Sequence, residues 1–532
     1  MPSDFPRGSR RVAPLFACLA LTAAATAQWS DDAAVNQSLA PDGPAGDQVQ
    51  SKLVRTPDGG SWVSYFSSTG GYDVYIQRLE ADGTPVFPGG VLVADRSFSS
   101  TQDYGMDIDS TGAAVLAYRA GSSSSPGVWA NRVLADGTLA WGAGVQLATG
   151  SPQIAAPCVA ATSDGGVVVA WTAFPSNAIV ELRKLDLNGT VVASHTMTRA
   201  AGISVTSIVA SDAPGATGEC VLMTVGFGGF TSPRPLRVQK FDASLTPMWQ
   251  ADDVPVFTAG SVQIGARPAI RPDGDGGCIS AWYSSSPSLR VFAQQIRADG
   301  TARLSTSQYA VTSTFENQVN PTAAIDPDTG DLYCFWSTLN STQSQFSLKA
   351  QRFTGTTRAW GTSGLTLLPL GGTQIIPAGC EARSGGGATG FWVFDTLPNP
   401  QMLYAVGLDD AGTPTWSGSA GGVTGGVAVS TASSQKSRVA TAMRPDGEIV
   451  AVWSDDRGGT ERMYGQNIQT DGSLGTAALV GDLNGDGAVD SADLGLLIAA
   501  WGKCGKGACP ADLNGDGVVN SADLGLLIAN WT

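Results

Sequence analysis

Short runs of β-branched, aromatic and alternating polar residues follow one another along most of the chain. Examples are "VVVAW" at 167–171 and "IVAVW" at 449–453, each preceded by a Gly-containing turn sequence such as Pro-Asp-Gly. Such runs fit strands whose successive side chains point to opposite faces and pack against neighbouring sheets. We therefore expect a mainly β fold of many short strands.

The runs are organised in a repeat, which is clearest in "AMRPDGEIVAVWSDDRGGTERMYGQNIQTDGSLG". Each unit has a short strand, a Pro-Asp-Gly-type turn, a strand ending in an aromatic residue and a variable polar loop. A third strand resembling "YIQRL" follows, then an Asp-Gly turn and a last strand that often carries Trp or Phe. Asp-Gly and Asn-Gly favour turns with positive φ, so each joins two antiparallel strands.

The Asp-Gly turn marks the period of the repeat. Clear copies lie at Asp82-Gly83, Asp136-Gly137, Asn188-Gly189, Asp299-Gly300 and Asp471-Gly472, and degenerate copies lie near Ser244, Gly355 and Gly412. This gives eight units between about Gln50 and Val480, at a spacing typical of propeller blades. We predict an eight-bladed β-propeller over 28–480; a seven-bladed ring is the second alternative and a β-sandwich array the third.

The two ends of this region complement each other. The segment "AAVNQSLAPDGP" before Gln50 looks like an outermost strand, while the eighth unit lacks its own last strand. We expect the N-terminal strand to complete the last blade and close the ring. The repeat also resembles propeller-like repeats of bacterial secreted proteins that pair "VWxDxR" with "YxQRLD", best at 452–457 with Tyr464 and Gln466.

The pattern changes after residue 480, where two near-copies of a polar loop are each followed by an amphipathic stretch. Both loops fit the calcium-loop template D-x-[DN]-x-[DN]-G with a carboxylate at position twelve. Hard oxygen ligands at alternate positions suit Ca²⁺, so we predict two ions. The predicted ligands are Asp482, Asn484, Asp486, the carbonyl of Ala488, Asp490 and Asp493 in the first loop, and Asp512, Asn514, Asp516, the carbonyl of Val518, Asn520 and Asp523 in the second.

The stretches after the loops predict two short helices. Leu494, Leu497, Ile498 and Trp501 follow i, i+3, i+4, i+7 spacing, as do Leu524, Leu527, Ile528 and Trp531. Because neither helix can bury that face alone, we expect the copies to pack together. Cys504 and Cys509, between the copies, are close enough in sequence to form a disulfide.

A calcium loop with an exit helix, repeated in tandem, resembles the type I dockerin domain over 481–532. The resemblance implies calcium binding and docking onto a cohesin-like module of a scaffold or cell-surface protein. In that family, loop positions ten and eleven often contact the cohesin; here they are Ser491-Ala492 and Ser521-Ala522. The alanines depart from the hydroxyl-rich pairs of well-known dockerins.

Composition and charge restrict the function further. Acidic residues (46) outnumber basic ones (31) and no Lys/Arg cluster occurs, which argues against nucleic-acid binding. Arg7, Arg10 and Arg11, an apolar stretch and Ala25-Thr26-Ala27 predict a signal peptide over 1–27 and a mature start at Gln28. No later segment approaches the roughly 20 apolar residues of a membrane span. We expect a secreted, extracellular or cell-surface protein.

Export permits disulfides, but the remaining cysteines suggest none. Five are spread about one per repeat unit, without CxxC spacing, and are expected to be buried small hydrophobes. They are Cys158, Cys220, Cys278, Cys334 and Cys380.

Candidate catalytic chemistry is sparse. His195 is the only histidine, and a solvated structural role is the better interpretation. Paired carboxylates at Asp252-Asp253, Asp409-Asp410 and Asp455-Asp456 leave a glycosidase open, although Asp455 beside Arg457 favours a structural pair. The recurring third-strand arginines would form a site only if they converged in the central channel. Exposed loop aromatics could stack on sugars: Tyr72, Phe174, Phe230 and Tyr283.

Three functions remain open. The first is a secreted, non-catalytic propeller that binds or displays a ligand, for which polysaccharide is one candidate, anchored through the calcium module. The second is a polysaccharide-degrading glycoside hydrolase or lyase with the same module as its docking tag. The third is a structural surface-assembly protein. No catalytic residue is assigned.

Overall fold

The computed structural model describes residues 29–96, 104–122, 125–150, 153–227, 233–263, 266–304, 311–312, 316–395, 400–475, 481–484, 489–504 and 509–531. The expected signal peptide over 1–27, and Gln28, lie outside the described residues.

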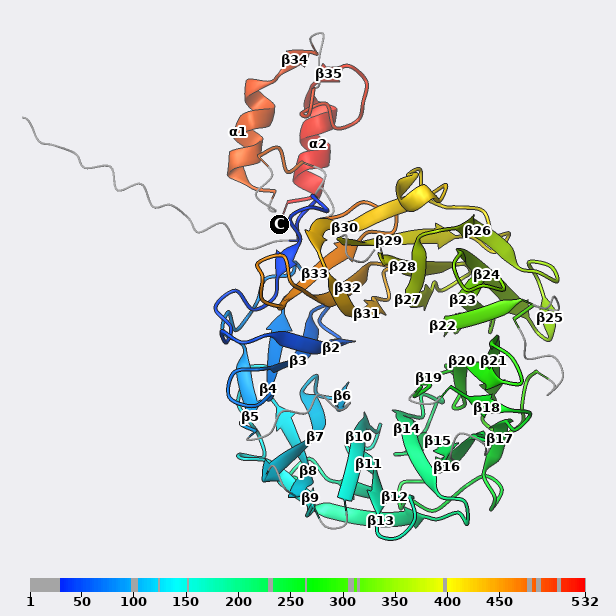
Figure 1. Ribbon diagram of the computed structural model, residues 1–532. Helices are drawn as coiled ribbons and strands as arrows, with labels where there is room; N and C mark the ends of the chain where they lie inside the picture. The colour runs from blue at the N-terminus through cyan, green and yellow to red at the C-terminus, as the bar shows by residue number, and fades with distance from the viewer. Residues whose placement is uncertain are drawn as a thin grey trace, which may run out of the picture.

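Eight antiparallel sheets follow one another round a ring (Figure 1). Blade 1 holds β2 (Gln48–Arg55), β3 (Ser61–Ser67), β4 (Asp73–Leu79) and β5 (Val91–Ala94). Blade 2 holds β6 (Gly105–Ile108), β7 (Ala114–Ser122), β8 (Ser125–Val133) and β9 (Val145–Ala148). Blade 3 holds β10 (Gln153–Ala161), β11 (Val167–Phe174), β12 (Ile179–Leu185) and β13 (Val191–Met197). Blade 4 holds β14 (Ile203–Ala210), β15 (Cys220–Gly226), β16 (Leu236–Phe241) and β17 (Val254–Phe257).

The second half of the ring varies the same plan. In blade 5, β18 (Ser261–Val262) and β19 (Ile270–Pro272) both pair with β20 (Cys278–Ser286), which also pairs with β21 (Arg290–Ile296). Blade 6 holds β22 (Asn317–Ile325), β23 (Leu332–Leu339) and β24 (Phe346–Thr354), the last paired with both β25 (Thr357–Arg358) and β26 (Leu365–Gly371). Blade 7 holds β27 (Gln374–Ala382), β28 (Ala388–Asp395), β29 (Gln401–Leu408) and β30 (Gly426–Ser434), with the 3₁₀ turn η1 (Ala420–Gly422) before β30.

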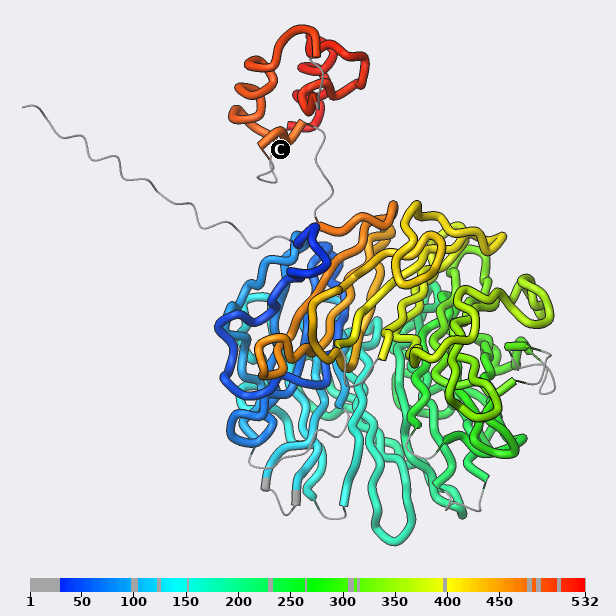
Figure 2. Tube along the Cα trace, turned by 45° about the horizontal axis from the view of Figure 1, so that its top comes forward, coloured from blue at the N-terminus to red at the C-terminus, as the bar shows by residue number. Residues whose placement is uncertain are grey.

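Blade 8 is built from both ends of the propeller. Its chain-consecutive strands are β31 (Lys436–Met443), β32 (Ile449–Asp455) and β33 (Arg462–Ile468), and its outer strand is β1 (Gln37–Ser38) from the N-terminal segment. The N-terminal and C-terminal strands therefore lie side by side in both views (Figures 1 and 2). The predicted closure of an eight-bladed ring is confirmed, and the seven-bladed and sandwich alternatives are wrong.

The core is a series of layers between neighbouring sheets. A fully buried Trp lies on the second strand of six blades, because this strand has a sheet on both faces. These residues are Trp62, Trp171, Trp282, Trp336, Trp392 and Trp453. Of the five dispersed cysteines, Cys158 is half-buried and the other four are buried, and within the described residues none of the five forms a disulfide.

The Asp-Gly turns have a second role, which is to receive an aromatic side chain from the preceding blade. Trp141 Nε1 of blade 2 donates to Leu187 O beside Gly189 of blade 3, at 2.9 Å. Trp416 of blade 7 likewise reaches Thr470 O of blade 8, at 2.9 Å. Glycine is needed here because it has positive φ and because a Cβ would meet the indole.

Trp29 completes this series at the ring closure. Its Nε1 donates to Ala81 O at 3.2 Å, and a Cβ on Gly83 would lie 2.5 Å from its ring. Ser30 O accepts from Gln466 Nε2 of β33 at 2.5 Å. The same kind of contact occurs within blade 4, where Gln250 O accepts from Gln239 Nε2 of the third strand at 3.0 Å. The segment that begins at Trp29 therefore takes the place of blade 8's missing fourth strand.

The C-terminal region is helical and lies outside the ring (Figure 1). It contains α1 (Ser491–Ala499), α2 (Ser521–Ala529) and a small pairing of β34 (Gly502–Lys503) with β35 (Val518–Val519). Among the described residues no helix is long and apolar enough to cross a membrane.

Candidate functional site

The second Asp/Asn/Gly loop winds its side-chain oxygens back onto its own backbone. Asp512 accepts from the backbone N–H of Asp516 at 3.1 Å and of Gly517 at 2.7 Å. Asn514 Oδ1 accepts from Asp516 N at 2.9 Å, and Asp516 Oδ1 accepts from Val518 N at 2.9 Å. Gly517 has φ of 86°, which makes the tight turn possible. Alternate oxygens are thereby held on the inside of the loop.

The carboxylate at position twelve is fully buried and fixed by three backbone donors. Asp523 Oδ1 accepts from Leu513 N at 2.8 Å and Asn514 N at 3.1 Å, and Oδ2 accepts from Asn520 N at 2.8 Å. The donated N–H bonds, first that of Asn520, lower the pKa of Asp523. This carboxylate therefore stays ionised in its buried position.

The first loop repeats this arrangement where it is described. Asp493 Oδ1 accepts from Leu483 N at 2.7 Å and Asn484 N at 3.1 Å, and Oδ2 accepts from Asp490 N at 2.9 Å. Asp486 and Ala488, two of the predicted ligands, lie outside the described residues.

Position nine has a role that the sequence analysis missed. Asp490 and Asn520 are the N-caps of α1 and α2, and each accepts from the N–H two residues later, at 2.7 Å. With the carboxylate at position twelve they form capping boxes, which supply hydrogen-bond acceptors for orphan N–H groups. The sequence contains the signal for a capping box, because in each copy an Asp or Asn is followed three residues later by an Asp, as in D-S-A-D and N-S-A-D. Each loop and its exit helix are thus one hydrogen-bonded unit.

The oxygen-rich chemistry of the second loop fits a hard cation. It presents the carboxylates of Asp512, Asp516 and Asp523, two amide oxygens and the carbonyl of Val518, with no sulfur or nitrogen ligand. Among the described residues, no three His, Cys, Asp or Glu side chains stand close enough together to hold a metal ion by themselves. The second loop matches calcium by the type and order of its donors and not by a preformed cluster of carboxylates.

The two copies pack through fewer residues than the helical spacing predicts. The buried contacts come from Leu497, Leu527 and the loop residues Val489 and Val519, with Leu494 and Leu524 at the edge. The prediction is wrong for the other four, which are 46–57% exposed: Ile498, Trp501, Ile528 and Trp531. The loop valines occupy the space between the helices, so the helix ends project into solvent.

The predicted partner-contact residues lie at the first turn of each helix. Ser491, Ala492, Ser521 and Ala522 are all exposed. A disulfide joins Cys504 to Cys509, with Cα atoms 5.9 Å apart.

In the propeller, the third-strand cations do not converge. Five of them pair with a carboxylate in the first turn of their own blade, as Lys184 Nζ does with Asp164 Oδ2 at 2.6 Å. In blade 2 the pair is Arg132 with Asp109. Burial by itself would raise the pKa of Asp109, but the hydrogen bonds from Arg132 and Thr111 outweigh burial, so the pKa is lowered overall. The remaining pairs are Arg78–Asp58, Lys240–Glu219 and Arg352–Asp331. These residues hold the blades together.

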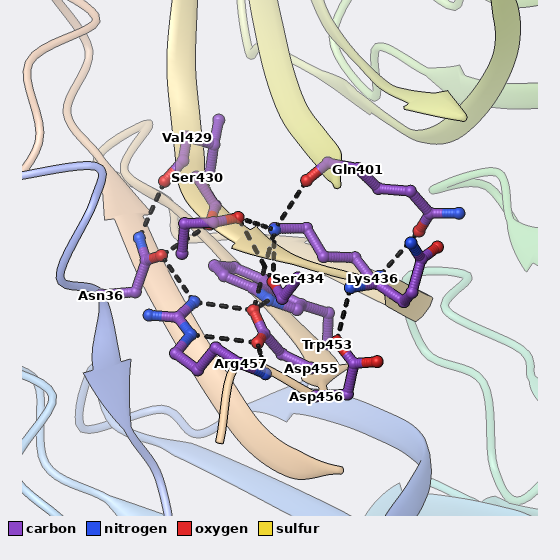
Figure 3. Close-up of polar contacts among 12 residues, drawn as sticks. Asn36, Gln401, Val429, Ser430, Ser434, Lys436, Trp453, Asp455, Asp456 and Arg457 are labelled. Carbon is purple, nitrogen blue, oxygen red and sulfur yellow. Dashed lines mark hydrogen bonds and ion pairs between the residues drawn. The ribbon is translucent and has the colours of Figure 1, made fainter. Parts of the chain in front are cut away.

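The Asp455–Arg457 pair belongs to a buried cluster at the ring closure (Figure 3). Asp455 accepts from Arg457 at 2.7 and 3.0 Å and from Trp453 Nε1 at 3.1 Å. Arg457 also donates to Val35 O at 2.6 Å and Asn36 Oδ1 at 3.0 Å. The pair therefore fastens the N-terminal segment to blade 8, as the structural interpretation expects.

Lys436 lies at the centre of the same cluster and was not singled out from the sequence. Its side chain is fully buried, and Nζ donates at 2.8 Å each to Gln401 O, Ala432 O and Ser434 Oγ. Burial lowers its pKa from 10.5 to about 8, against the opposing charge of Asp455 3.8 Å away. The amine is therefore shielded from solvent by the closure.

His195 is half-buried on β13, edge-on to the ring of Phe241 at a centroid distance of 5.2 Å. Burial lowers its pKa. Of the candidate sugar-stacking aromatics, Tyr72, Phe174 and Tyr283 are half-buried and Phe230 lies outside the described residues.

Residues 480–531 match the family model of the dockerin type I domain. No curated protein matches the sequence.

Among solved structures, the chain is similar to a polysaccharide lyase described as an ulvan lyase, at 10% identity, covering 83% of this chain and 97% of the other, with a TM-score of 0.46. It is also similar to the β-propeller domain of the Trilobed protease from Pyrococcus furiosus, at 10% identity, 67% and 95% coverage and a TM-score of 0.36. A puromycin hydrolase matches at 14% identity, 81% and 61% coverage and a TM-score of 0.40.

Dockerin domains bind calcium and dock onto cohesin modules, and proteins that carry them are typically extracellular. The chain thus consists of an eight-bladed β-propeller followed by a C-terminal dockerin type I domain.

Proposed function

We propose that this chain is a secreted, non-catalytic propeller that binds or displays a ligand and is anchored through its dockerin domain. The observation that carries the proposal is the dockerin match over 480–531, together with two copies of one loop-and-helix unit. The dockerin domain occupies 481–532, the propeller 28–480, and the signal peptide 1–27 directs export.

The domain holds two Ca²⁺ ions, one in each loop. The oxygens of 482, 484, 486, 490 and 493 with the carbonyl of 488 form the first site, and 512, 514, 516, 520 and 523 with the carbonyl of 518 form the second. The backbone hydrogen bonds of Asp512 and Asp523 support this assignment because they fix carboxylates before the ion binds. Calcium offsets the mutual repulsion of these aspartates.

The docking surface for a cohesin-like partner lies on the exposed helix faces. Ser491-Ala492 and Ser521-Ala522 begin these faces, and the exposed Ile498 and Ile528 continue them. Exposed apolar side chains at equivalent positions of both copies are unusual in a 52-residue segment that has so little core, and a partner would cover them.

The propeller itself supplies a ligand-binding or display surface. One member of each candidate carboxylate pair is engaged by an arginine: Asp253 by Arg199, Asp410 by Arg352 and Asp455 by Arg457. This arrangement supports binding over hydrolysis, with polysaccharide as the ligand class.

The test uses the purified mature chain in a glycan-binding array and a reducing-sugar release assay on the same polysaccharides. Binding without release supports the proposal. Release of reducing ends, or of unsaturated products, would establish the hydrolase or lyase alternative instead.

A further inference from the structure

A pocket of about 450 Å³ opens where blade 3 meets blade 4. It is lined by the connection from β13 to β14, by the end of β15 and by the start of β16. These segments lie on the face of the ring that carries the loops between second and third strands. None of the contacts described above uses this pocket.

Its walls are mostly apolar and include one exposed aromatic ring. Ile203, Pro233 and Pro235 contribute apolar surface, and the side chain of Phe227 is 51% exposed. The ring of Phe227 packs edge-on against Phe174 at a centroid distance of 5.3 Å. The backbone of Phe227 is also fixed, because its N–H donates to Gly202 O at 3.0 Å. The ring is therefore a fixed apolar surface and not a free side chain.

Two arginines line the same pocket, and no carboxylate is among the described residues that line it. Arg199 pairs with the buried Asp253 behind the wall, with Nη2 2.6 Å from Oδ2. Arg237 Nη1 donates to the backbone carbonyl of Asp252 at 2.8 Å and, more weakly, to that of Asp253 at 3.3 Å. Arg199 thus has a carboxylate partner, whereas the described contacts of Arg237 are with backbone carbonyls, in a chain of net charge −15.

The orientation of Arg237 leaves donors for a ligand. Its Nε and Nη2 make no hydrogen bond within the part of the chain that the structure describes, and its side chain is half-buried. A guanidinium group held at one nitrogen and open at the others is suited to a carboxylate, which it can bind through two parallel N–H bonds.

We propose that this pocket binds an acidic sugar residue of a polysaccharide. The sugar ring lies against Phe227 between the two prolines, and its carboxylate accepts from Arg237 with Arg199 alongside. Apolar walls with a few placed polar groups are the usual composition of a ligand pocket. The assignment rests on the proposed ligand-binding role of the propeller and names its ligand class.

The test is isothermal calorimetry of the mature chain with an oligogalacturonate and with a neutral galactose oligomer of the same length. We expect binding of the acidic oligomer alone. Arg237→Met and Phe227→Ala should each weaken it about tenfold or more, as expected for the loss of a charge-assisted hydrogen bond or a stacking surface. Arg297→Met removes the same charge from an exposed turn elsewhere and should leave affinity unchanged.

Each of the other possible results of this experiment shows which part of the proposal is wrong. Equal affinity for the acidic and neutral oligomers, or equal affinity of wild type and Arg237→Met, would refute the pocket while glycan binding by the propeller stands. Binding of poly-glutamate without either oligomer would replace the sugar by an acidic peptide. If no oligomer and no array glycan binds the folded chain, both the pocket and the ligand-binding role are contradicted. Circular dichroism and thermal unfolding of each variant confirm that it is folded.

Discussion

Lys436 shows what a single residue contributes at the ring closure. Burial lowers its pKa from 10.5 to about 8, so the folded state disfavours the charged amine. Below pH 8 this penalty is fully present; between about pH 8 and 10.5 the unfolded chain keeps a proton that the folded chain releases. Stability from this group therefore rises with pH in that window, at up to about 1.4 kcal/mol per pH unit.

The first prediction follows from these contacts. Lys436→Met leaves the carbonyls of Gln401 and Ala432 without their buried donor, so the free energy of unfolding should fall by about 2 kcal/mol at pH 8. The deficit should widen towards pH 10, because only the wild type gains from deprotonation. Urea unfolding at pH 8, 9 and 10 measures it. A deficit that stays constant across these pH values would refute the lowered pKa.

Gly83 tests the aromatic-to-glycine contact between blades. Its φ is 89°, and a Cβ would lie 2.5 Å from the Trp29 ring. Gly83→Ala should cost about 2–4 kcal/mol, from positive φ plus overpacking. Gly215→Ala is the matched control, because Gly215 has φ of 81° and nothing within 4 Å of the added Cβ. It should cost only about 1 kcal/mol. Equal shifts in the denaturant midpoint would show that the indole contact does not matter.

At the scale of elements, the ring is closed by the short strand β1 and by the segment before it. Trp29 is 4% exposed and makes the last contact of the aromatic series. Trp29→Ala should lower the free energy of unfolding by about 3–5 kcal/mol. Trp501→Ala, at a residue 50% exposed on the dockerin domain, should change it by less than about 1 kcal/mol. Chemical denaturation followed by circular dichroism compares them, and comparable losses would contradict the closure role.

The strands and their grouping into blades are also the features that the sequence predicted best. Turn residues and β-branched runs are local signals, so the blade count and the completion of blade 8 by the N-terminal strand could be predicted. The Trp that follows several of the turns, such as Trp141 and Trp416, was visible in the sequence, but its contact is in the next blade. No local sequence pattern indicates a contact between residues of different blades. Lys436 was missed for the same reason, because its acceptors come from Gln401 and the end of β30.

The helices show the limit of periodicity. The i, i+3, i+4, i+7 spacing identified α1 and α2 but not which residues they bury. Val489 and Val519, which lie before the helices, fill the space that Ile498 and Trp501 were expected to occupy. The calcium loops could be proposed from spacing because the ligands of such a loop are nearly consecutive, and the ligand set stays a prediction. The pocket at Phe227 joins two blades and has no motif.

At the scale of the whole molecule, we expect calcium to link the folding of the dockerin domain to anchoring. Calorimetric titration of the mature chain should show two calcium ions bound, with a gain in helical circular dichroism. Asp512→Ala should reduce the stoichiometry to one, while Asp299→Ala, in an exposed propeller turn, should leave two. A stoichiometry unaffected by Asp512→Ala would place calcium elsewhere.

The most direct test of the account is capture of the mature chain by immobilised type I cohesin modules, with calcium and with EDTA. The account predicts capture in calcium, loss in EDTA, and no capture of a chain that ends at Gly475. It also predicts much weaker capture when Ser491, Ala492, Ser521 and Ala522 are all replaced by Asp. Capture that persists in EDTA or without the dockerin domain, or no capture of the calcium-loaded chain by any cohesin, would contradict calcium-dependent anchoring.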